Sequence, residues 1–325
     1  MTNVAFDQLP ETVVKVSGLP KTAGEDLPEY YQTLGDGSRK LIGIATGISE
    51  IDRATMGLSG VIILGGIAGQ GKTSLALQVA YEACEQGTPI IFYSLEMPKR
   101  AIYTKILNRL SGVGYGDILL KGKPYLTPQN KDLEGREVDF SHLFSKDEAE
   151  ALSQAQSRLE KVGDRLYIRS RETGEAPINF KTLETEINLV KTKHQAERVL
   201  VVVDHLQVFT LEERVADQIQ KESKLIDGFK GVSEKTNTPI LLISQKNKQG
   251  FTSSGLESIK GSVDIVYLAD IVMFLEGENE SKEEAIFNNG QKKIKLVISK
   301  NRYNSPTTLD FMFDGKNSNF EPQYR

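Results

Sequence analysis

A glycine-rich segment that ends in a lysine and a threonine directly follows a run of apolar residues. Gly66, Gly71, Lys72 and Thr73 fit the pattern G-x-x-x-x-G-K-[ST], and VIILGG before them has the composition of a buried strand. Such a loop turns backbone N–H groups toward phosphate oxygens, and the positive end of the following helix adds to the attraction. The alternative is a turn that only packs a helix on a sheet, but such a turn needs no lysine. We therefore predict a nucleotide-binding segment made of Gly66, Ala68, Gly69, Gln70, Gly71, Lys72, Thr73 and Ser74.

Hydrolysis of a nucleotide requires further groups, and three other apolar runs end in residues that could supply them. The Lys72 ammonium would contact the β- and γ-phosphates, while the Thr73 hydroxyl and the Asp204 carboxylate would hold Mg²⁺. Glu96 is a candidate general base for water, and the Gln245 amide could sense the γ-phosphate. The spacing also allows plainer interpretations, in which Glu96 begins a helix and the other two simply end strands.

Parallel strands are needed to bring these residues to one edge of a sheet. The apolar runs that favour buried strands are Val61–Gly66, Pro89–Leu95, Arg165–Ser170, Arg198–Asp204, Pro239–Ser244, Asp270–Glu276 and Ile294–Lys300. Helical periodicity favours helices over Thr73–Gln86, Lys99–Leu110, Lys146–Lys161, Asn179–Thr192 and Gln218–Asn237. This alternation predicts an α/β fold with a mostly parallel central sheet and helices on both faces. The segment IKLVISKNRYNSPTTLDFMFD predicts an antiparallel edge, and Gly112–Asp139 a long surface loop.

The first 40 residues differ from the rest, because they contain three prolines and no sustained period. We expect residues 1–40 to form an arm or linker with a short helix near Pro28–Leu34, and residues 41–325 to form one domain. A partly ordered terminus and an arm that docks on a neighbouring subunit are both consistent with this composition.

Composition excludes several classes of protein. Forty basic against 44 acidic residues give a net charge of −4, so nucleic acid could be contacted only through local basic patches. A single cysteine, Cys84, excludes a disulfide-stapled scaffold, and we expect it to be buried packing. No apolar run approaches the roughly 18 residues of a membrane span, and the N-terminus does not resemble a signal peptide. We therefore expect a cytoplasmic protein without membrane association.

Several ordered motifs together resemble the motor domain of the DnaB family of replicative helicases, a RecA-like P-loop NTPase. The similarity extends over Thr46–Phe320, and Ser-Leu-Glu-Met-Pro at Ser94–Pro98 is its most specific part. The further motifs are TGISEIDRATMGL at Thr46–Leu58, GQGKTS, VDHLQ at Val203–Gln207, LISQ at Leu242–Gln245 and KNR at Lys300–Arg302.

The resemblance implies roles for individual residues. Glu96 would be the catalytic base, Asp204 the metal acid and Gln245 the γ-phosphate sensor. Lys300 and Arg302 would reach across a subunit boundary to the neighbour's nucleotide, although a solvated basic strand end would look the same.

The resemblance further implies an ATP- and Mg²⁺-dependent DNA helicase or translocase that acts as a ring, with six subunits, 5′ to 3′ on single-stranded DNA during replication. The DNA-binding candidates follow Gln245 and are Lys246, Lys248, Gln249, Lys260, Gly261 and Ser262; a solvated loop is the alternative. A primase or a helicase loader would be a further partner.

There are departures from the family pattern and two rival functions. We expect the chain to lack the helical domain that usually precedes the motor. His205 stands where an aromatic residue is more familiar, and we interpret it as a packed core histidine. One rival is a recombination or repair ATPase of the RecA, RadA or KaiC-like kind. The other is a nucleotide-switched loading or assembly factor that unwinds nothing.

Overall fold

The computed structural model describes residues 21–35, 40–122, 143–171, 177–211, 218–245, 268–277 and 291–323. Two units make up the chain, Met1–Lys40 and Leu41–Arg325. The first contains helix α1 (Ala23–Thr33), which is longer than the predicted Pro28–Leu34. It begins earlier because Thr22 and Glu25 form a capping box that satisfies the first backbone N–H groups.

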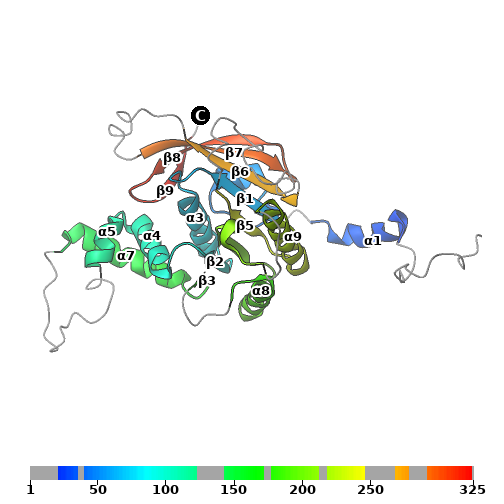
Figure 1. Cartoon of the computed structure of the whole chain (residues 1–325), viewed down its shortest axis with the longest axis horizontal. Helices are drawn as coiled ribbons and strands as arrows, with labels where there is room; N and C mark the ends of the chain where they lie inside the picture. Colours follow the sequence, from blue (N-terminus) through cyan, green and yellow to red (C-terminus); the bar gives the residue numbers. More distant parts are fainter. Residues whose placement is uncertain are drawn as a thin grey trace, which may run out of the picture. The chain divides into compact units, whose positions relative to one another are not determined.

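The second unit is built on a sheet whose nine described strands run in the order β3-β2-β4-β5-β1-β6-β7-β8-β9 (Figure 1). The first six strands of that order run parallel to one another, as the buried apolar runs predict. They are β1 (Val61–Gly66), β2 (Ile90–Ser94), β3 (Leu166–Ser170), β4 (Leu200–Asp204), β5 (Ile240–Ile243) and β6 (Ile271–Gly277).

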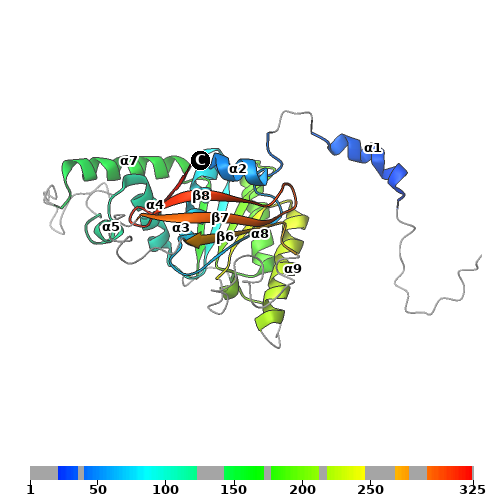
Figure 2. The ribbon, with the colours of Figure 1, turned by 90° about the horizontal axis from the view of Figure 1, so that it is seen from above.

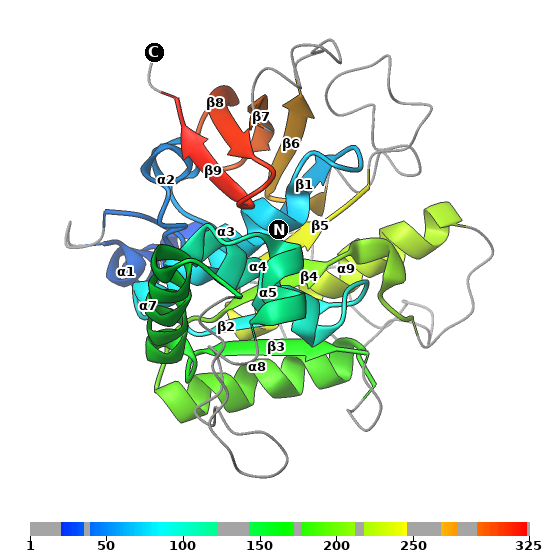
Figure 3. The same cartoon turned by 90° about the vertical axis from the view of Figure 1, so that its left-hand side faces the viewer.

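The last three strands form the antiparallel edge, which is confirmed and has one strand more than predicted. They are β7 (Gln291–Asn301), β8 (Thr307–Asp314) and β9 (Asn319–Pro322). Figure 3 shows this edge at the opposite end of the sheet from β3. The short β9 is held by Gln78 of helix α3 (Lys72–Glu85), whose side-chain amide exchanges two 2.9 Å hydrogen bonds with the backbone of Phe320.

Five predicted helices are confirmed to within two residues at each end. They are α3 (Lys72–Glu85), α4 (Lys99–Ser111), α7 (Lys146–Val162), α8 (Phe180–His194) and α9 (Gln218–Thr236), and the 3₁₀ turn η2 (Leu206–Val208) lies between the last two (Figure 2). Helix α2 (Ser49–Thr55) was not predicted. The predicted loop Gly112–Asp139 is wrong at its start, where the chain forms helix α5 (Tyr115–Lys121). This helix forms because Ile118 is buried against α4 and α7. Residues 123–142 of the predicted loop lie outside the described residues.

Alternate residues of β1 explain why both faces of the sheet are covered. Ile62 and Leu64 belong to a core cluster shared with α3, whereas Val61 and Ile63 belong to a second cluster shared with α8 and α9. Cys84 of α3 is 2% exposed within the first cluster, which confirms its packing role. No helix in the described part of the chain is both long and apolar enough to span a membrane.

Candidate functional site

The predicted phosphate segment forms the loop between β1 and α3. Gly69 and Gly71 have φ values of 82° and 85°, in the left-handed region that favours glycine. A Cβ atom at Gly71 would also lie 2.8 Å from ring atoms of Phe313 and Phe320. The antiparallel edge therefore packs directly beneath this loop and fixes the N-terminus of α3.

Lys72 is the first residue of α3, and its ammonium group is directed at backbone carbonyls of the loop. Its Nζ donates to the oxygens of Gly66 at 2.7 Å and Ile67 at 2.9 Å. Burial lowers the pKa of Lys72, and the carboxylates of Asp204 and Glu96 oppose that change. Among the described residues, the hydrogen-bond partners of this buried cation are the two carbonyls, so it is well suited to bind the oxygens of a phosphate chain.

A candidate metal position lies where α3 meets the end of β4. The Thr73 Oγ1 donates a 2.8 Å hydrogen bond to Asp204 Oδ2, and Asp204 is 2% exposed. Burial raises the pKa of Asp204, and the bond from Thr73 acts in the opposite direction. A hydroxyl and a carboxylate oxygen at this separation suit Mg²⁺, which prefers a few oxygen ligands together with phosphate and water.

Glu96 follows β2, the strand that pairs with β4 so that Ser94 lies opposite Asp204. The turn that carries it is fixed by two bonds, from Leu95 N to Asp204 O at 2.7 Å and from Ser94 Oγ to Met97 O at 2.7 Å. The strand register thus places the Glu96 carboxylate beside the metal position, as the parallel topology predicts.

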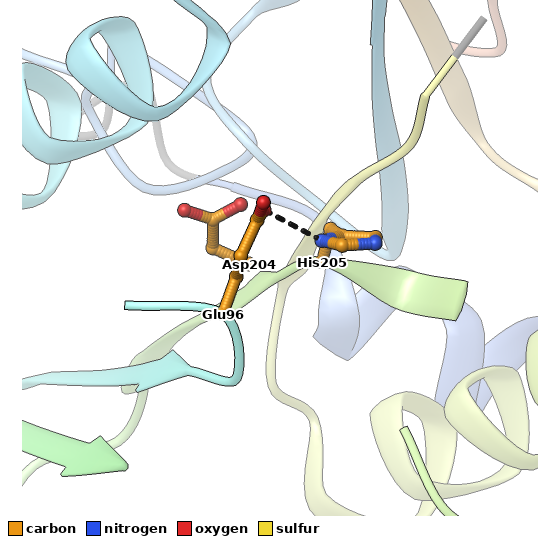
Figure 4. Close-up of side chains that lie close together, drawn as sticks. All are labelled: Glu96, Asp204 and His205. Carbon is orange, nitrogen blue, oxygen red and sulfur yellow. Dashed lines mark hydrogen bonds and ion pairs between the residues drawn. The ribbon is translucent and has the colours of Figure 1, made fainter. Parts of the chain in front are cut away.

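His205 adjoins this carboxylate, and Figure 4 shows the two side chains joined across the end of β4. The His205 Nδ1 lies 3.1 Å from Glu96 Oε2. The side-chain ligand atoms of Glu96, Asp204 and His205 all lie within 4.8 Å of one another. His205 is buried, as predicted, but the interpretation as mere packing omitted its hydrogen bond to Glu96.

These side chains line one cavity of about 440 Å³, a volume in the range of small-molecule sites. The cavity brings together most of the predicted site residues, and Gly66 and Gln70 of the predicted phosphate segment are not in its lining. The predicted residues that line it are Ala68, Gly69, Gly71, Lys72, Thr73, Ser74, Glu96, Asp204 and Gln245. Several further residues line the cavity without having been predicted as site residues: Met97, Lys105, His205, Ile243, Lys292, Phe313, Gly315 and Ser318.

Lys105 is the most informative of the missed residues. It lies on α4, half-buried, and burial lowers its pKa while Asp204 opposes that effect. Among the described residues, its ammonium has no hydrogen-bond partner. A lysine between the buried Ile102 and Ile106 in the sequence was the available signal, because a cation on an apolar helix face requires a special reason to be there.

Lys300 and Arg302 lie outside the cavity, at the end of β7. Arg302 Nη1 forms a 3.0 Å ion pair with Asp270 Oδ1, whose other oxygen accepts a 2.8 Å bond from Val61 N. Val61 begins β1, whereas the phosphate loop follows its end. Lys300 and Arg302 therefore lie at the opposite end of the strands from the chain's own phosphate loop.

The predicted DNA-contacting residues Lys246, Lys248, Lys260 and Gly261 fall outside the described residues. Gln245, just before them, lines the cavity, and its neighbour Ser244 accepts a 2.9 Å bond at Oγ from Gln207 Nε2 of η2. This bond ties the end of β5 to the segment after Asp204.

The phosphate loop, the paired Thr73 and Asp204, and the parallel sheet define a P-loop NTPase fold. The family model for the DnaB-like helicase C-terminal domain matches residues 43–322, so the chain belongs to this family. Replicative DNA helicase DnaB of Treponema pallidum is 24% identical over 91% of this chain and 59% of its own length. The protein of the same name from Leifsonia xyli is 25% identical over 88% and 56%. The chain thus spans less than two thirds of these relatives.

Solved structures confirm the RecA-like ATPase fold. One solved ATPase domain superposes with a TM-score of 0.77 at 18% identity, covering 94% of this chain and all of that one. A DnaB-like replicative helicase, described with its interactions with primase, gives 0.72 at 19% identity and covers 93% of this chain and 67% of its own. A KaiC-like protein of Pyrococcus horikoshii gives 0.53 at 16%, covering 86% and 98%. The expected resemblance to the helicase motor is therefore confirmed.

Proposed function

We propose that the chain is an ATP-hydrolysing motor that translocates on single-stranded DNA and separates strands during replication in the cytoplasm. The observation that carries this proposal is the cavity in which Lys72, Thr73, Asp204, Glu96 and Gln245 converge, in a member of the DnaB-like family. The proposed assembly is a ring of six subunits, and the proposed polarity is 5′ to 3′.

In this proposal, each side chain of the cavity has one task toward ATP and Mg²⁺. Lys72 and the loop N–H groups hold the phosphates, and Thr73 with Asp204 holds Mg²⁺, which neutralises phosphate charge when bound. Glu96 accepts a proton from the attacking water, and the Gln245 amide contacts the γ-phosphate. The short path from Gln245 to the Gln207–Ser244 hydrogen bond would pass a change at the γ-phosphate to the residues that follow β5.

The positions of Lys300 and Arg302 support a role in trans. They lie near the start of β6, while the phosphate loop lies beside its far end, so about 15–20 Å of strand separates the two positions. An arginine at that distance cannot reach the chain's own γ-phosphate, but it is available to a nucleotide bound by a neighbouring copy. Hydrolysis would then require correctly placed neighbours.

The remaining roles complete the proposal. Lys246, Lys248, Lys260 and Gly261 would contact DNA phosphates inside the ring, and residues 1–40 would form an arm that docks on the next subunit. A primase or a loading factor is a proposed partner, since one structural relative is described with primase.

The variant Glu96→Gln tests the central residue, because the amide keeps the shape of the side chain but cannot accept the proton. Turnover stimulated by single-stranded DNA should fall at least about 100-fold, whereas affinity for a fluorescent ATP analogue stays within twofold. Unchanged turnover would remove Glu96 from the role of base.

Strand separation is tested with forked DNA substrates that carry a single-stranded arm of either polarity. The proposal predicts displacement that requires ATP and a 5′ arm. ATPase activity without displacement of either substrate would instead support a loading or recombination factor.

A further inference from the structure

We propose that His205 is a positioning residue that holds the Glu96 carboxylate in place for hydrolysis. The inference rests on the proposed role of Glu96 as the base and adds to it a second residue. The supporting contact is the 3.1 Å hydrogen bond between His205 Nδ1 and Glu96 Oε2. A carboxylate accepts hydrogen bonds, so Nδ1 carries the proton and donates it.

Glu96 needs such a partner because its environment leaves it free to move. Its side chain is 57% exposed, and a glutamate has several rotatable bonds. Among the described residues, His205 provides the single hydrogen bond to this carboxylate. A general base acts efficiently when it is held within reach of its water, and a misplacement of about 1 Å can cost about 100-fold in rate.

The His205 ring is well placed to provide this restraint. Its side chain is only 11% exposed and directly follows Asp204, the last residue of β4. The backbone on both sides is fixed, since Asp204 O accepts from Leu95 N at 2.7 Å and His205 O accepts from Val208 N at 3.2 Å. The rigid strand end that places the candidate metal ligand Asp204 therefore also places the group that orients Glu96.

Direct metal ligation is the competing use of this ring, because its nitrogen lies within 4.8 Å of the ligand atoms of Glu96 and Asp204. The Nδ1 atom cannot donate a proton to Glu96 and bind a cation at the same time. The two uses therefore predict different responses to Mg²⁺ concentration.

Three substitutions separate the hydrogen bond from the volume of the ring. The amide nitrogen in His205→Asn lies near the position of Nδ1, whereas that in His205→Gln lies farther out, and His205→Phe keeps a ring without a donor. We expect kcat for DNA-stimulated ATP hydrolysis to stay within about threefold for His205→Asn and to fall ten- to 100-fold for the other two. The KM for ATP and the affinity for a fluorescent ADP analogue should change less than twofold. Thermal melting of each variant verifies its fold.

Several results would overturn the inference. A normal kcat in His205→Phe would show that no donor is needed, and a fall in His205→Asn as large as in His205→Phe would show that Nδ1 is not the active atom. Recovery of His205→Phe at high Mg²⁺ would assign the ring to the metal instead. Glu96→Gln is assayed in parallel: if it retains turnover, the proposed base and the inference both fail, whereas its loss beside a normal His205→Phe contradicts the inference alone.

Discussion

Basic side chains lie in very different environments at the two ends of the central strands. At the cavity end, where the parallel strands terminate, Lys72 is buried and Lys105 is half-buried beside a cavity that Asp204 and Glu96 also line. At the far end, where the parallel strands begin, the Arg302 side chain is 49% exposed and pairs with Asp270. In the proposed function, the cavity end would bind a nucleotide by itself, whereas the far end would act only on a nucleotide bound by a neighbouring copy. Hydrolysis would then depend on assembly.

The largest effect is expected at the far end of the strands, for the variant Arg302→Ala. We expect turnover to fall about 1,000-fold, because a cation supplied in trans stabilises charge in the transition state of phosphoryl transfer. Nucleotide affinity of the dissociated subunit should stay within twofold. Lys293→Ala, an exposed residue near the other end of the same strand, is the control and should retain activity. Weakened binding of nucleotide by isolated Arg302→Ala subunits would contradict this distinction, because the far end should not contribute to binding within one subunit.

An intermediate effect is expected at the cavity end for Lys105→Met, which keeps the apolar stem of the side chain but removes its charge. The loss of one ammonium directed at the cavity should weaken ATP binding about tenfold, measured by titration with a fluorescent analogue. Arg100→Met, an exposed residue in the first turn of the same helix, serves as control. Equal ATP affinity in wild type and Lys105→Met would remove Lys105 from the phosphate site.

The smallest effect concerns the stability of the protein without metal. Burial raises the pKa of Asp204 above its ordinary value of 3.8, so the fold favours the protonated carboxyl group. The ionised form consequently destabilises the fold at neutral pH, and this cost disappears as the pH falls below the unfolded-state value. Asp204→Asn should therefore raise Tm by a few degrees at pH 7 in EDTA but not near pH 3, while abolishing metal-dependent turnover. A lower Tm at pH 7 would show that the hydrogen bond from Thr73 outweighs the burial cost.

The sequence predicts those parts of the fold and site that depend on local pattern. Buried apolar runs give the strands, and their last residues give Glu96, Asp204 and Gln245, because parallel strands end at one edge. The side chains supplied by distant packing were missed. Phe313 and Phe320 reach the phosphate loop only because the antiparallel edge folds beneath Gly71.

The contact between His205 and Glu96 has a similar origin. Each residue follows a different strand, and no pattern in either segment shows that β2 and β4 pair with Ser94 opposite Asp204. Helix α5 escaped prediction because its seven residues make only about two turns, which is too short to show a helical period.

Mixing two inactive variants tests most directly whether one active site is divided between two copies of the chain. Glu96→Gln subunits lack the base but keep Arg302, whereas Arg302→Ala subunits keep the base. After the two are mixed, dissociated and reassembled in equal amounts, half of the unlike contacts would place an intact Arg302 beside a nucleotide with an intact Glu96. We predict DNA-stimulated ATP hydrolysis well above that of either variant alone. No gain in a sample shown by native mass spectrometry to contain mixed assemblies would contradict the division of the site between subunits.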